Sequence, residues 1–337
     1  MASTLARRSL QVSRVAMKFA APFRISGYVF ETMPSVIAVL RDGELSGRGE
    51  AAGVYYVGDD QDRMIADIEA VRPALEGGAD RAALQTLLPA CGARNALDCA
   101  LWELESLQAG LPVWQLAGVP SPGARITTFT LPADDPSVLA EMIRDFGHAK
   151  AIKLKFDGDL AADTQRLAVV RAARPDAWLA VDANQGYSDA DLAGLERLLV
   201  GHSVELLEQP VPRGCETLLA GWRPSFLVGA DESILDLAEL AEKGHYYDVI
   251  NIKLDKCGGL TEALEMARSA KAMGKQVMVG NMGGSTLAMA PGFVLAQQCD
   301  VIDLDGPASL PDDPLASQIY SNGEIFVPEH LWGSAGG

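Results

Sequence analysis

Cysteine and histidine are scarce in this chain, and neither is spaced as a metal site or a disulfide framework requires. The five cysteines lie far apart without a CxxC pair, and there are four histidines. Because zinc sites and disulfide-rich folds are recognised by close, repeated spacing of these residues, neither is expected here. This cysteine usage is typical of reduced proteins, and we expect a cytoplasmic location.

Basic charge and long apolar runs are also lacking. The chain has 28 lysines and arginines against 45 acidic residues, a net charge of −17, which argues against a nucleic-acid partner. No apolar run reaches the roughly 20 residues that a membrane helix needs, and the first residues contain no apolar core of a signal peptide. No membrane partner is therefore expected.

Two different patterns divide the chain. Residues 9–57 alternate apolar and polar side chains, with Asp42-Gly43 as a hairpin signal, and predict a meander of antiparallel strands. Residues 61–118 then change to helical periodicity, within which Gly110 ends the second helix. Strands followed by helices indicate a small α+β unit, which we place at residues 1–122.

The next segment, residues 123–310, alternates short apolar strands with helical stretches. The eight strand-like segments are RITTFTL, AIKLKF, AWLAVDAN, VELLEQP, FLVGADES, DVINIKL, QVMVG and VIDLDGP. Their spacing of roughly 20 to 30 residues predicts a parallel βα barrel. A doubly wound open sheet is the alternative, and the lack of a dinucleotide-binding fingerprint disfavours it. Residues 311–337 lack this rhythm and are expected to return to the first unit.

The ends of these strands carry ionisable and amide side chains, at the edge where parallel barrels perform catalysis. The residues are Lys153, Lys155, Asp182, Asn184, Glu208, Asp231, Glu232, Lys253, Asp303 and Asp305. Asp182, Glu208 and Asp231 follow consecutive strands, so their carboxylates repel one another unless a hard cation neutralises them. Because the cluster contains only carboxylates and no histidine, we expect Mg²⁺, with Mn²⁺ as a substitute, rather than zinc.

Lysines lie on the strands before and after this cluster. Lys153 and Lys155 are two residues apart, so their side chains leave the same face of one strand, and Lys253 ends a later strand. A metal ion and partial desolvation both lower the pKa of a lysine, which lets the neutral amine act as a base. A cation between two such bases suits removal of a proton next to a carboxylate, and return of the proton on the other face is racemisation or epimerisation.

Five motifs between residues 153 and 259 extend this pattern: KLK, VDANQGY, LLEQPVP, ADES and INIKLDKCGG, in this order. In these motifs the chain resembles the enolase superfamily, in its muconate-lactonising subgroup. The resemblance implies an α/β fold, a (β/α)7β barrel with an α+β capping domain built from the N-terminal part and the C-terminal tail. It also implies Asp182, Glu208 and Asp231 as the ligands of Mg²⁺.

The resemblance implies roles for the neighbouring residues as well. The implied acid/base pair is Lys155 and Lys253, Lys153 lies beside the first of them, and Asn184 and Glu232 are partners of the metal site and of Lys253 rather than ligands. Lys256 also follows the strand of Lys253, but the alternation of side chains turns it the other way. We interpret Lys256 as structural.

The last strand bears on the choice of reaction. Asp303 and Asp305 share a face of VIDLDGP, and this Asp-x-Asp resembles the signature of dipeptide epimerases, in which the pair holds the α-ammonium group of the substrate. A turn residue before Gly306-Pro307 is the alternative for Asp305. Thr130, Asn281 and Met282 match positions that line the pocket in such enzymes. Since glycine-rich barrel loops also bind phosphate, a phosphate site at GNMGGS stays open as a second use.

Specificity is expected to come from loops of the capping unit. Arg24 would pair with a glutamate side chain, which suits L-Ala-D/L-Glu as substrate, although Tyr28 lies nearer the place where glutamate-specific relatives carry their arginine. A solvated strand residue is the alternative for Arg24, and Asp59 and Asp60 would instead attract a cationic side chain. The expected partner is a small dipeptide, and a homo-oligomer is left open.

Two other functions also stay open. One is another enzyme of the subgroup: a cycloisomerase, an o-succinylbenzoate synthase or an N-acylamino-acid racemase. Asp303 and Asp305 argue against these enzymes, because their substrates lack an ammonium group for the pair to hold. The other is a non-catalytic metal-binding barrel, against which the complete set of lysines and carboxylates argues.

Overall fold

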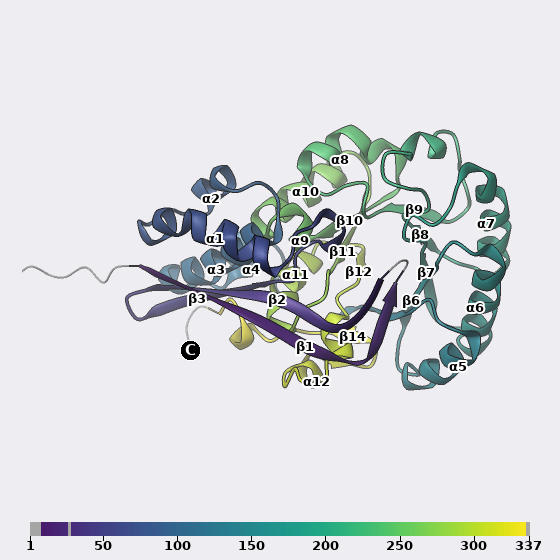
Figure 1. The fold of residues 1–337 in the computed structure, drawn as a ribbon, viewed down its shortest axis with the longest axis horizontal. Coiled ribbons are helices and arrows are strands. Elements are labelled where there is room, and N and C mark those ends of the chain that lie inside the picture. Colours follow the sequence, from purple (N-terminus) through teal and green to yellow (C-terminus); the bar gives the residue numbers. More distant parts are fainter. Residues whose placement is uncertain (1–7, 26–27, 335–337) are drawn as a thin grey trace, which may run out of the picture.

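The computed structural model describes residues 8–25 and 28–334, and its first unit is an antiparallel sheet covered by helices (Figure 1). The sheet has the order β1 (Ser9–Ile25), β2 (Tyr28–Asp42) and β3 (Leu45–Ala51). The hairpin expected at Asp42-Gly43 is confirmed, since Gly43 takes a left-handed φ of 61° and Asp42 pairs with Leu45.

Four helices follow the sheet: α1 (Gln61–Glu76), α2 (Arg81–Leu87), α3 (Gly92–Ala109) and α4 (Val113–Ala117). The long helix α3 lies directly on β3, because Gly47 and Gly49 leave room for it. A Cβ atom added at either glycine would collide with a backbone carbonyl oxygen of α3. Gly110 ends α3 in the left-handed conformation, as the sequence predicted.

The second unit is a barrel of eight parallel strands, each hydrogen-bonded to the next in chain order. The strands are β5 (Thr128–Leu131), β6 (Ala151–Lys155), β7 (Trp178–Asp182), β8 (Leu206–Glu208), β9 (Leu227–Ala230), β10 (Val249–Lys253), β11 (Gln276–Gly280) and β12 (Val301–Ile302). Side chains close the ring: Leu304 N donates to Thr127 Oγ1 at 3.0 Å, and Thr130 N donates to Asp305 Oδ2 at 2.6 Å. The barrel is confirmed over the open sheet.

Helices surround the strands on the outside of the barrel (Figure 1). They are α5 (Pro136–Asp145), α6 (Leu160–Ala173), α7 (Asp189–Gly201), α8 (Leu237–Lys243), α10 (Leu260–Ala272) and α11 (Thr286–Ala296), with the short helices α9 (Leu254–Cys257) and α12 (Ala316–Ile319). Single 3₁₀ turns are η1 (Tyr55–Val57), η2 (Glu216–Leu219), η3 (Gly244–Tyr246), η4 (Gly306–Ser309) and η5 (Glu329–Leu331). None of the helices in the described part of the chain is both long and apolar enough to cross a membrane.

The barrel has two cores, one between the strands and the helices and one inside the ring of strands. Successive side chains of a strand alternate between the two cores, and this alternation decides which residues reach the centre of the barrel. Most strand residues pack outward against the helices, while Ala180, Leu206, Val249 and Met278 form a separate cluster inside the barrel. Because side chains alternate along a strand, the residue two positions after each inward one also points inward. Asp182, Glu208 and Asn251 follow this rule, so their polar groups meet above the inner cluster.

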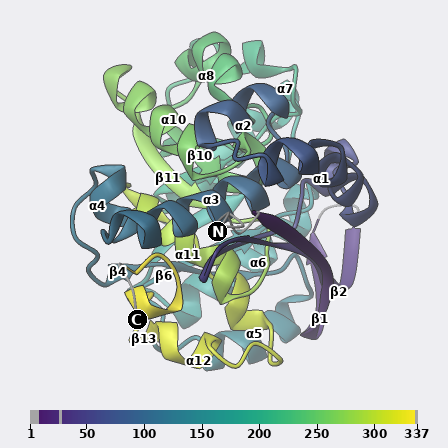
Figure 2. The same ribbon diagram turned by 90° about the vertical axis from the view of Figure 1, so that its left-hand side faces the viewer.

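The end of the chain connects both units. Strands β13 (Tyr320–Ser321) and β14 (Glu324–Ile325) pair with β4 (Arg125–Ile126) in a small sheet at the start of the barrel. Farther on, Gly333 O accepts from Val113 N at 2.9 Å, and Trp332 Nε1 donates to Arg48 O at 2.9 Å. We therefore propose to keep the division into residues 1–122, 123–310 and 311–337, with the last segment adding to the capping unit (Figure 2).

Candidate active site

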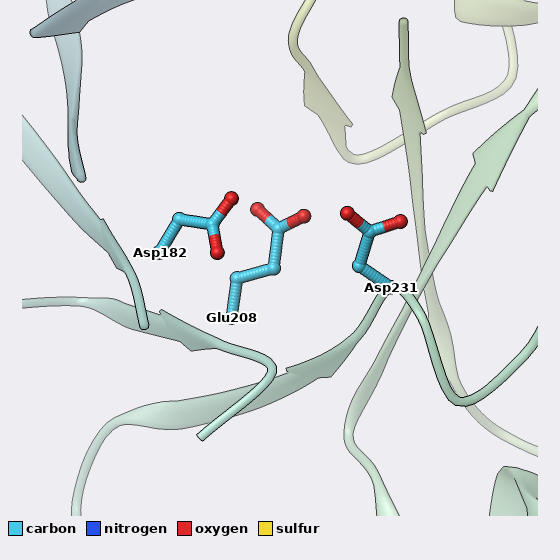
Figure 3. A group of neighbouring side chains, drawn as sticks. All are labelled: Asp182, Glu208 and Asp231. Carbon is cyan, nitrogen blue, oxygen red and sulfur yellow. The ribbon is translucent and has the colours of Figure 1, made fainter. Parts of the chain in front are cut away.

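Three carboxylates meet inside the barrel, as Figure 3 shows. Asp182 ends β7, Glu208 ends β8, and Asp231 follows the last residue of β9. All three are buried, and one oxygen from each lies within 4.8 Å of the others. The parallel register places Asp182 directly beside Glu208, so the sequence order of these acids becomes a spatial cluster.

Within this cluster, Glu208 lacks a close cation of its own among the described residues. Glu208 Oε1 accepts from Asn251 Nδ2 at 2.7 Å, but Glu208 Oε2 has no hydrogen-bond partner within the described part of the chain. The nearest ammonium, Lys153 Nζ, is 3.6 Å away. Burial and the neighbouring Asp182 raise the pKa of Glu208 to about 8. An unpartnered oxygen among three buried carboxylates fits a divalent cation that prefers oxygen ligands.

The lysines expected around the cluster do surround it. Lys155 Nζ bonds to Asp182 Oδ2 at 2.6 Å, and Lys253 Nζ bonds to Asp231 Oδ2 at 2.7 Å. Lys153, which points to the same side of β6 as Lys155, bonds to Asp303. The two proposed bases therefore approach the carboxylate triad from opposite ends.

Burial and the neighbouring carboxylates shift the pKa of Lys253 and of Lys153 in opposite directions. Burial lowers the pKa of Lys253, but Asp231 and Glu208 outweigh it and raise the pKa above its ordinary value. The pKa of Lys153 is raised in the same way, mainly by Asp303. A cation held by these carboxylates would offset their effect on the lysines, so the lowered pKa that we expect depends on its presence.

Lys256 does not point away from the site, and our interpretation of its direction was wrong. It lies in α9, one helical turn after β10, and its side chain turns back toward Asp231. Lys256 Nζ bonds to Asp231 Oδ1 at 2.7 Å and to Asp231 O at 2.6 Å. The strand alternation that we applied ends at Lys253, so it does not predict the direction of a side chain in the following helix.

Asn184 and Glu232 lie beside the ligands. Asn184 N donates to Asp182 Oδ1 at 2.9 Å, and Asn184 Nδ2 donates to Glu232 Oε1 at 3.4 Å. Burial and Asp231 raise the pKa of Glu232 to about 7. The Glu232 carboxylate accepts this hydrogen bond from Asn184, and the positive charge of the nearby Lys253 offsets part of the rise in its pKa.

Asp303 and Asp305 face the same cavity but differ in their surroundings. Asp303 is bonded to Lys153 and accepts from Thr128 Oγ1 at 2.5 Å. Burial raises the pKa of Asp303, but Lys153 outweighs this effect and the pKa falls below its ordinary value. Asp305 accepts from Thr130 and weakly from Asn281, and burial, with Asp303 next, raises its pKa. Among the residues that the structure describes, Asp305 is therefore the carboxylate of this pair without an ion pair.

The cavity above these groups encloses about 720 Å³, its open mouth included. It is lined by Lys153, Lys155, Lys253, Asp231, Glu232, Asn184, Asp303, Asp305, Thr130, Asn281, Met282 and, from the capping unit, Phe19, Met33, Tyr55 and Tyr56. Phe19 and Met33 were not among the sequence candidates. The side chains of Arg24 and Tyr28 lie outside the described residues; their backbones pair in the β1–β2 ribbon, Arg24 with Val29 and Tyr28 with Ile25.

The capping helix α3 contacts the turn that follows Lys256, at Cys257, Gly258 and Gly259. Arg94 donates to Cys257 O at 2.6 Å and to Gly258 O at 3.1 Å, and Asp98 accepts from Thr261 N at 2.9 Å. Both Gly258 and Gly259 have positive φ angles, 72° and 117°, and a Cβ atom on them would collide with Arg94 and Asp98 respectively. The two glycines of the KCGG motif are thus explained by contact with the cap.

Asp255, in the same turn, gives a test of how the cap and the barrel are joined. Its carboxylate accepts from Gly53 N at 2.9 Å, and burial raises its pKa from 3.8 to about 7. Because the folded pKa lies above the unfolded one, the proton stabilises the fold fully below about pH 4, and this contribution is lost as the pH rises through 7. Asp255→Asn is therefore expected to stabilise the protein by up to about 4 kcal/mol at pH 8 and hardly at all near pH 4.

Urea unfolding of both proteins at the two pH values measures this difference. The exposed Asp145→Asn serves as the control, since it removes a charge without any buried contact. An equal effect of Asp255→Asn at both pH values would contradict the prediction.

Family models match both units of the chain. The model described as "Enolase C-terminal domain-like" matches residues 137–322, and the N-terminal domain model of mandelate racemase and muconate lactonizing enzyme matches residues 7–118. Among the curated relatives, L-Ala-D/L-Glu epimerase from Escherichia coli is 34% identical over 95% of this chain and 100% of its own. N-acetyl-D-glutamate racemase from Pseudoalteromonas is 37% identical over 74% of this chain and 78% of its own.

Solved structures agree with these relatives. An enolase family member from Agrobacterium tumefaciens, with homology to dipeptide epimerases and bound sodium and L-Ala-L-Glu, is 34% identical and has a TM-score of 0.90, covering 97% of this chain and 100% of its own. Dipeptide epimerase from Methylococcus capsulatus, complexed with Mg and L-Arg-D-Lys, is 28% identical with a TM-score of 0.88 over 98% and 99%. The chain belongs to the enolase superfamily and is similar to its dipeptide epimerases.

Proposed function

We propose that this protein is a Mg²⁺-dependent dipeptide epimerase that inverts the α-carbon of the C-terminal residue. The observation that carries the proposal is the placement of two buried lysines at opposite ends of one carboxylate triad. Lys155 contacts Asp182, and Lys253 contacts Asp231, on strands that lie four positions apart in the barrel. A substrate held above the triad would present its α-carbon to one amine on each face.

The residues divide the work of such a reaction. One lysine removes the α-proton, and the other, in its ammonium form, returns a proton on the opposite face, so the configuration inverts. Asp182, Glu208 and Asp231 would hold the cation, which would supply positive charge to stabilise the negative charge that develops on the substrate carboxylate. Lys153, 3.6 Å from Glu208 and 4.0 Å from Asp182, adds a fixed positive charge beside this group.

The other end of the dipeptide would be held by Asp305. Its carboxylate faces the cavity without a cation of its own, and so it suits the α-ammonium group of the first residue. Asp303 would contribute less than the sequence suggested, because Lys153 already occupies it. We favour L-Ala-D/L-Glu as the dipeptide, since a relative of that name matches the chain over nearly its whole length.

A second candidate is racemisation of an N-acylated glutamate. It is favoured by the 37% identity to N-acetyl-D-glutamate racemase, although that match covers less of the chain. Such a substrate carries the same carboxylate and α-carbon but no ammonium group. The two candidates therefore differ at Asp305, while the lysines and the triad would serve both.

The test is exchange of the α-proton in D₂O with Mg²⁺ present. We expect a mass gain of one deuteron in the C-terminal residue of both L-Ala-L-Glu and L-Ala-D-Glu, and slow or no gain in N-acetylglutamate. Asp305→Asn should lower kcat/KM for the dipeptide about 10- to 100-fold, because a hydrogen bond to a charged group is lost, and leave N-acetylglutamate unchanged. The single substitution is preferred over a double one, since Asp303→Asn would also strand the buried Lys153.

The exposed Asp312→Asn is the matched control for loss of charge. Faster exchange of N-acetylglutamate than of any dipeptide, unaffected by Asp305→Asn, would favour the second candidate. No exchange of either class would contradict both.

A further inference from the structure

Asp231 is held by two lysines, one on each carboxylate oxygen. Lys253 Nζ bonds to Oδ2 at 2.7 Å and Lys256 Nζ bonds to Oδ1 at 2.7 Å. In the described part of the chain, neither Asp182 nor Glu208 has a comparable pair of cations within hydrogen-bond distance. A metal ion that shares the oxygens of Asp231 would therefore compete with at least one ammonium group.

The two lysines are held to very different degrees. Lys256 Nζ has three acceptors, namely Asp231 Oδ1, Asp231 O at 2.6 Å and Asn251 O at 3.0 Å, which use all three of its protons. Its side chain is 1% exposed. Lys253 Nζ has one hydrogen-bond acceptor among the described residues, Asp231 Oδ2, and it lines the open cavity.

The backbone of Lys256 is also held in place by hydrogen bonds, whereas the Lys253 side chain, although buried, lines the cavity. Helix α9, which carries Lys256, is bonded to the cap on two sides: Asp255 accepts from Gly53 N, and Cys257 O accepts from Arg94. Moving the Lys256 ammonium would break three hydrogen bonds in a closed environment. Moving the Lys253 ammonium breaks one, and the cavity receives it.

We propose that Lys256 is a positioning residue that keeps Asp231 directed at the cation, while Lys253 is the partner that leaves Asp231 when the cation binds. The inference rests on the part of the proposed function in which the triad binds a divalent cation. It adds a division of labour between two lysines three residues apart. The Lys253 ammonium would then turn from Asp231 toward the cavity, and the carboxylate stays in place because Lys256 still holds it.

Metal titration of the substrate-free protein tests this division. Mg²⁺ affinity is measured by isothermal titration calorimetry for the wild type, Lys253→Met and Lys256→Met, after chelation and dialysis. Lys253→Met removes the competitor and should bind Mg²⁺ about tenfold more tightly. Lys256→Met frees Asp231 to turn away and should bind it about 10- to 100-fold more weakly, as is typical when an outer partner of a ligand is lost.

The decisive result is that the two variants change the Mg²⁺ affinity in opposite directions. If both lysines acted only by repelling the cation, replacing either one with methionine would tighten Mg²⁺ binding. Tighter or unchanged binding in Lys256→Met overturns the proposal, and so does weaker or unchanged binding in Lys253→Met. Lys150→Met, which removes a lysine from the exposed pair with Glu324, should leave the affinity unchanged. Absence of Mg²⁺ binding by the wild type would instead contradict the proposed function.

Folding of each variant is checked by circular dichroism and thermal melting. If Lys256→Met does not fold, Lys256→Gln keeps hydrogen-bond donors at the same place and should bind Mg²⁺ more weakly than the wild type. If both Lys256 variants fail to fold, weaker or unchanged Mg²⁺ binding in Lys253→Met still overturns the proposal, because tighter binding is required in every case. Exchange of the α-proton gives a separate readout, because each lysine would act on a different epimer. Lys256→Met should slow the exchange that depends on Lys253 more than the exchange that depends on Lys155.

Discussion

Lys155→Met and Lys253→Met are each expected to reduce epimerisation by about 10²- to 10⁴-fold, the usual contribution of a general acid or base. Methionine keeps the length and apolar stem of lysine but cannot carry a proton. Since each lysine serves one face of the α-carbon, each variant should still exchange the α-proton of one epimer with solvent. The epimer that still exchanges should differ between the two variants.

Mass spectrometry of L-Ala-L-Glu and L-Ala-D-Glu after incubation in D₂O measures both effects. Lys243→Met, which removes a lysine from a pair with Glu239 far from the cavity, is the control for loss of a partly buried cation. Exchange of both epimers by either variant at the wild-type rate would rule out a mechanism with two bases. Loss of exchange from the same epimer in both variants would show that the lysines act in series on one face.

Glu208→Gln is expected to lower turnover at least about 10³-fold, with the Mg²⁺ affinity lowered in parallel, because the cation would supply several kcal/mol of charge stabilisation. The side chain keeps its size and its contact with Asn251, so the loss would come from the missing charge. Chelation of the wild type should have the same effect, and added Mg²⁺ or Mn²⁺ should restore turnover only in the wild type.

Although Glu208→Gln should lower turnover, it should raise the stability of the metal-free protein at high pH. The pKa of Glu208 is raised from 4.5 to about 8, so the proton stabilises the fold below about pH 4.5 and this contribution is lost as the pH rises through 8. Metal-free Glu208→Gln should therefore melt at a higher temperature than the metal-free wild type at pH 9 and at a similar one at pH 4.5. Lower melting temperatures at both values would contradict this account of the triad. The exposed Glu242→Gln is the control.

The carboxylate triad could be predicted from sequence because its position depends on two local rules. Strands of alternating burial place every second side chain inside the barrel, and parallel strands bring their carboxyl ends to one edge. Asp182 and Glu208 obey both rules, and Lys153 and Lys155 do so on β6. The eight strands themselves were each recognisable as short apolar segments at barrel spacing.

The parts that could not be predicted depend on contacts between distant segments. Phe19 and Met33 lie in a long ribbon whose alternation is the same whether it covers an active site or faces solvent. Lys256 was misjudged because the chain changes from strand to helix between it and Lys253. The pairing of Asp303 with Lys153 is likewise a tertiary contact, and it alters what the Asp-x-Asp motif can bind.

The hydrogen bonds between α3 and the segment around Gly258-Gly259 have a consequence for engineering. The cap segment that lines the cavity and the helix that holds the Gly258-Gly259 turn are separate parts of one unit, since Tyr55 and Tyr56 lie in η1 while Arg94 and Asp98 lie on α3. Loop grafts from relatives could thus retune selectivity without loosening the lysine-bearing turn. A wholesale swap of the cap would succeed only with donors whose corresponding helix also offers an arginine and an aspartate, spaced one turn apart, to that glycine pair.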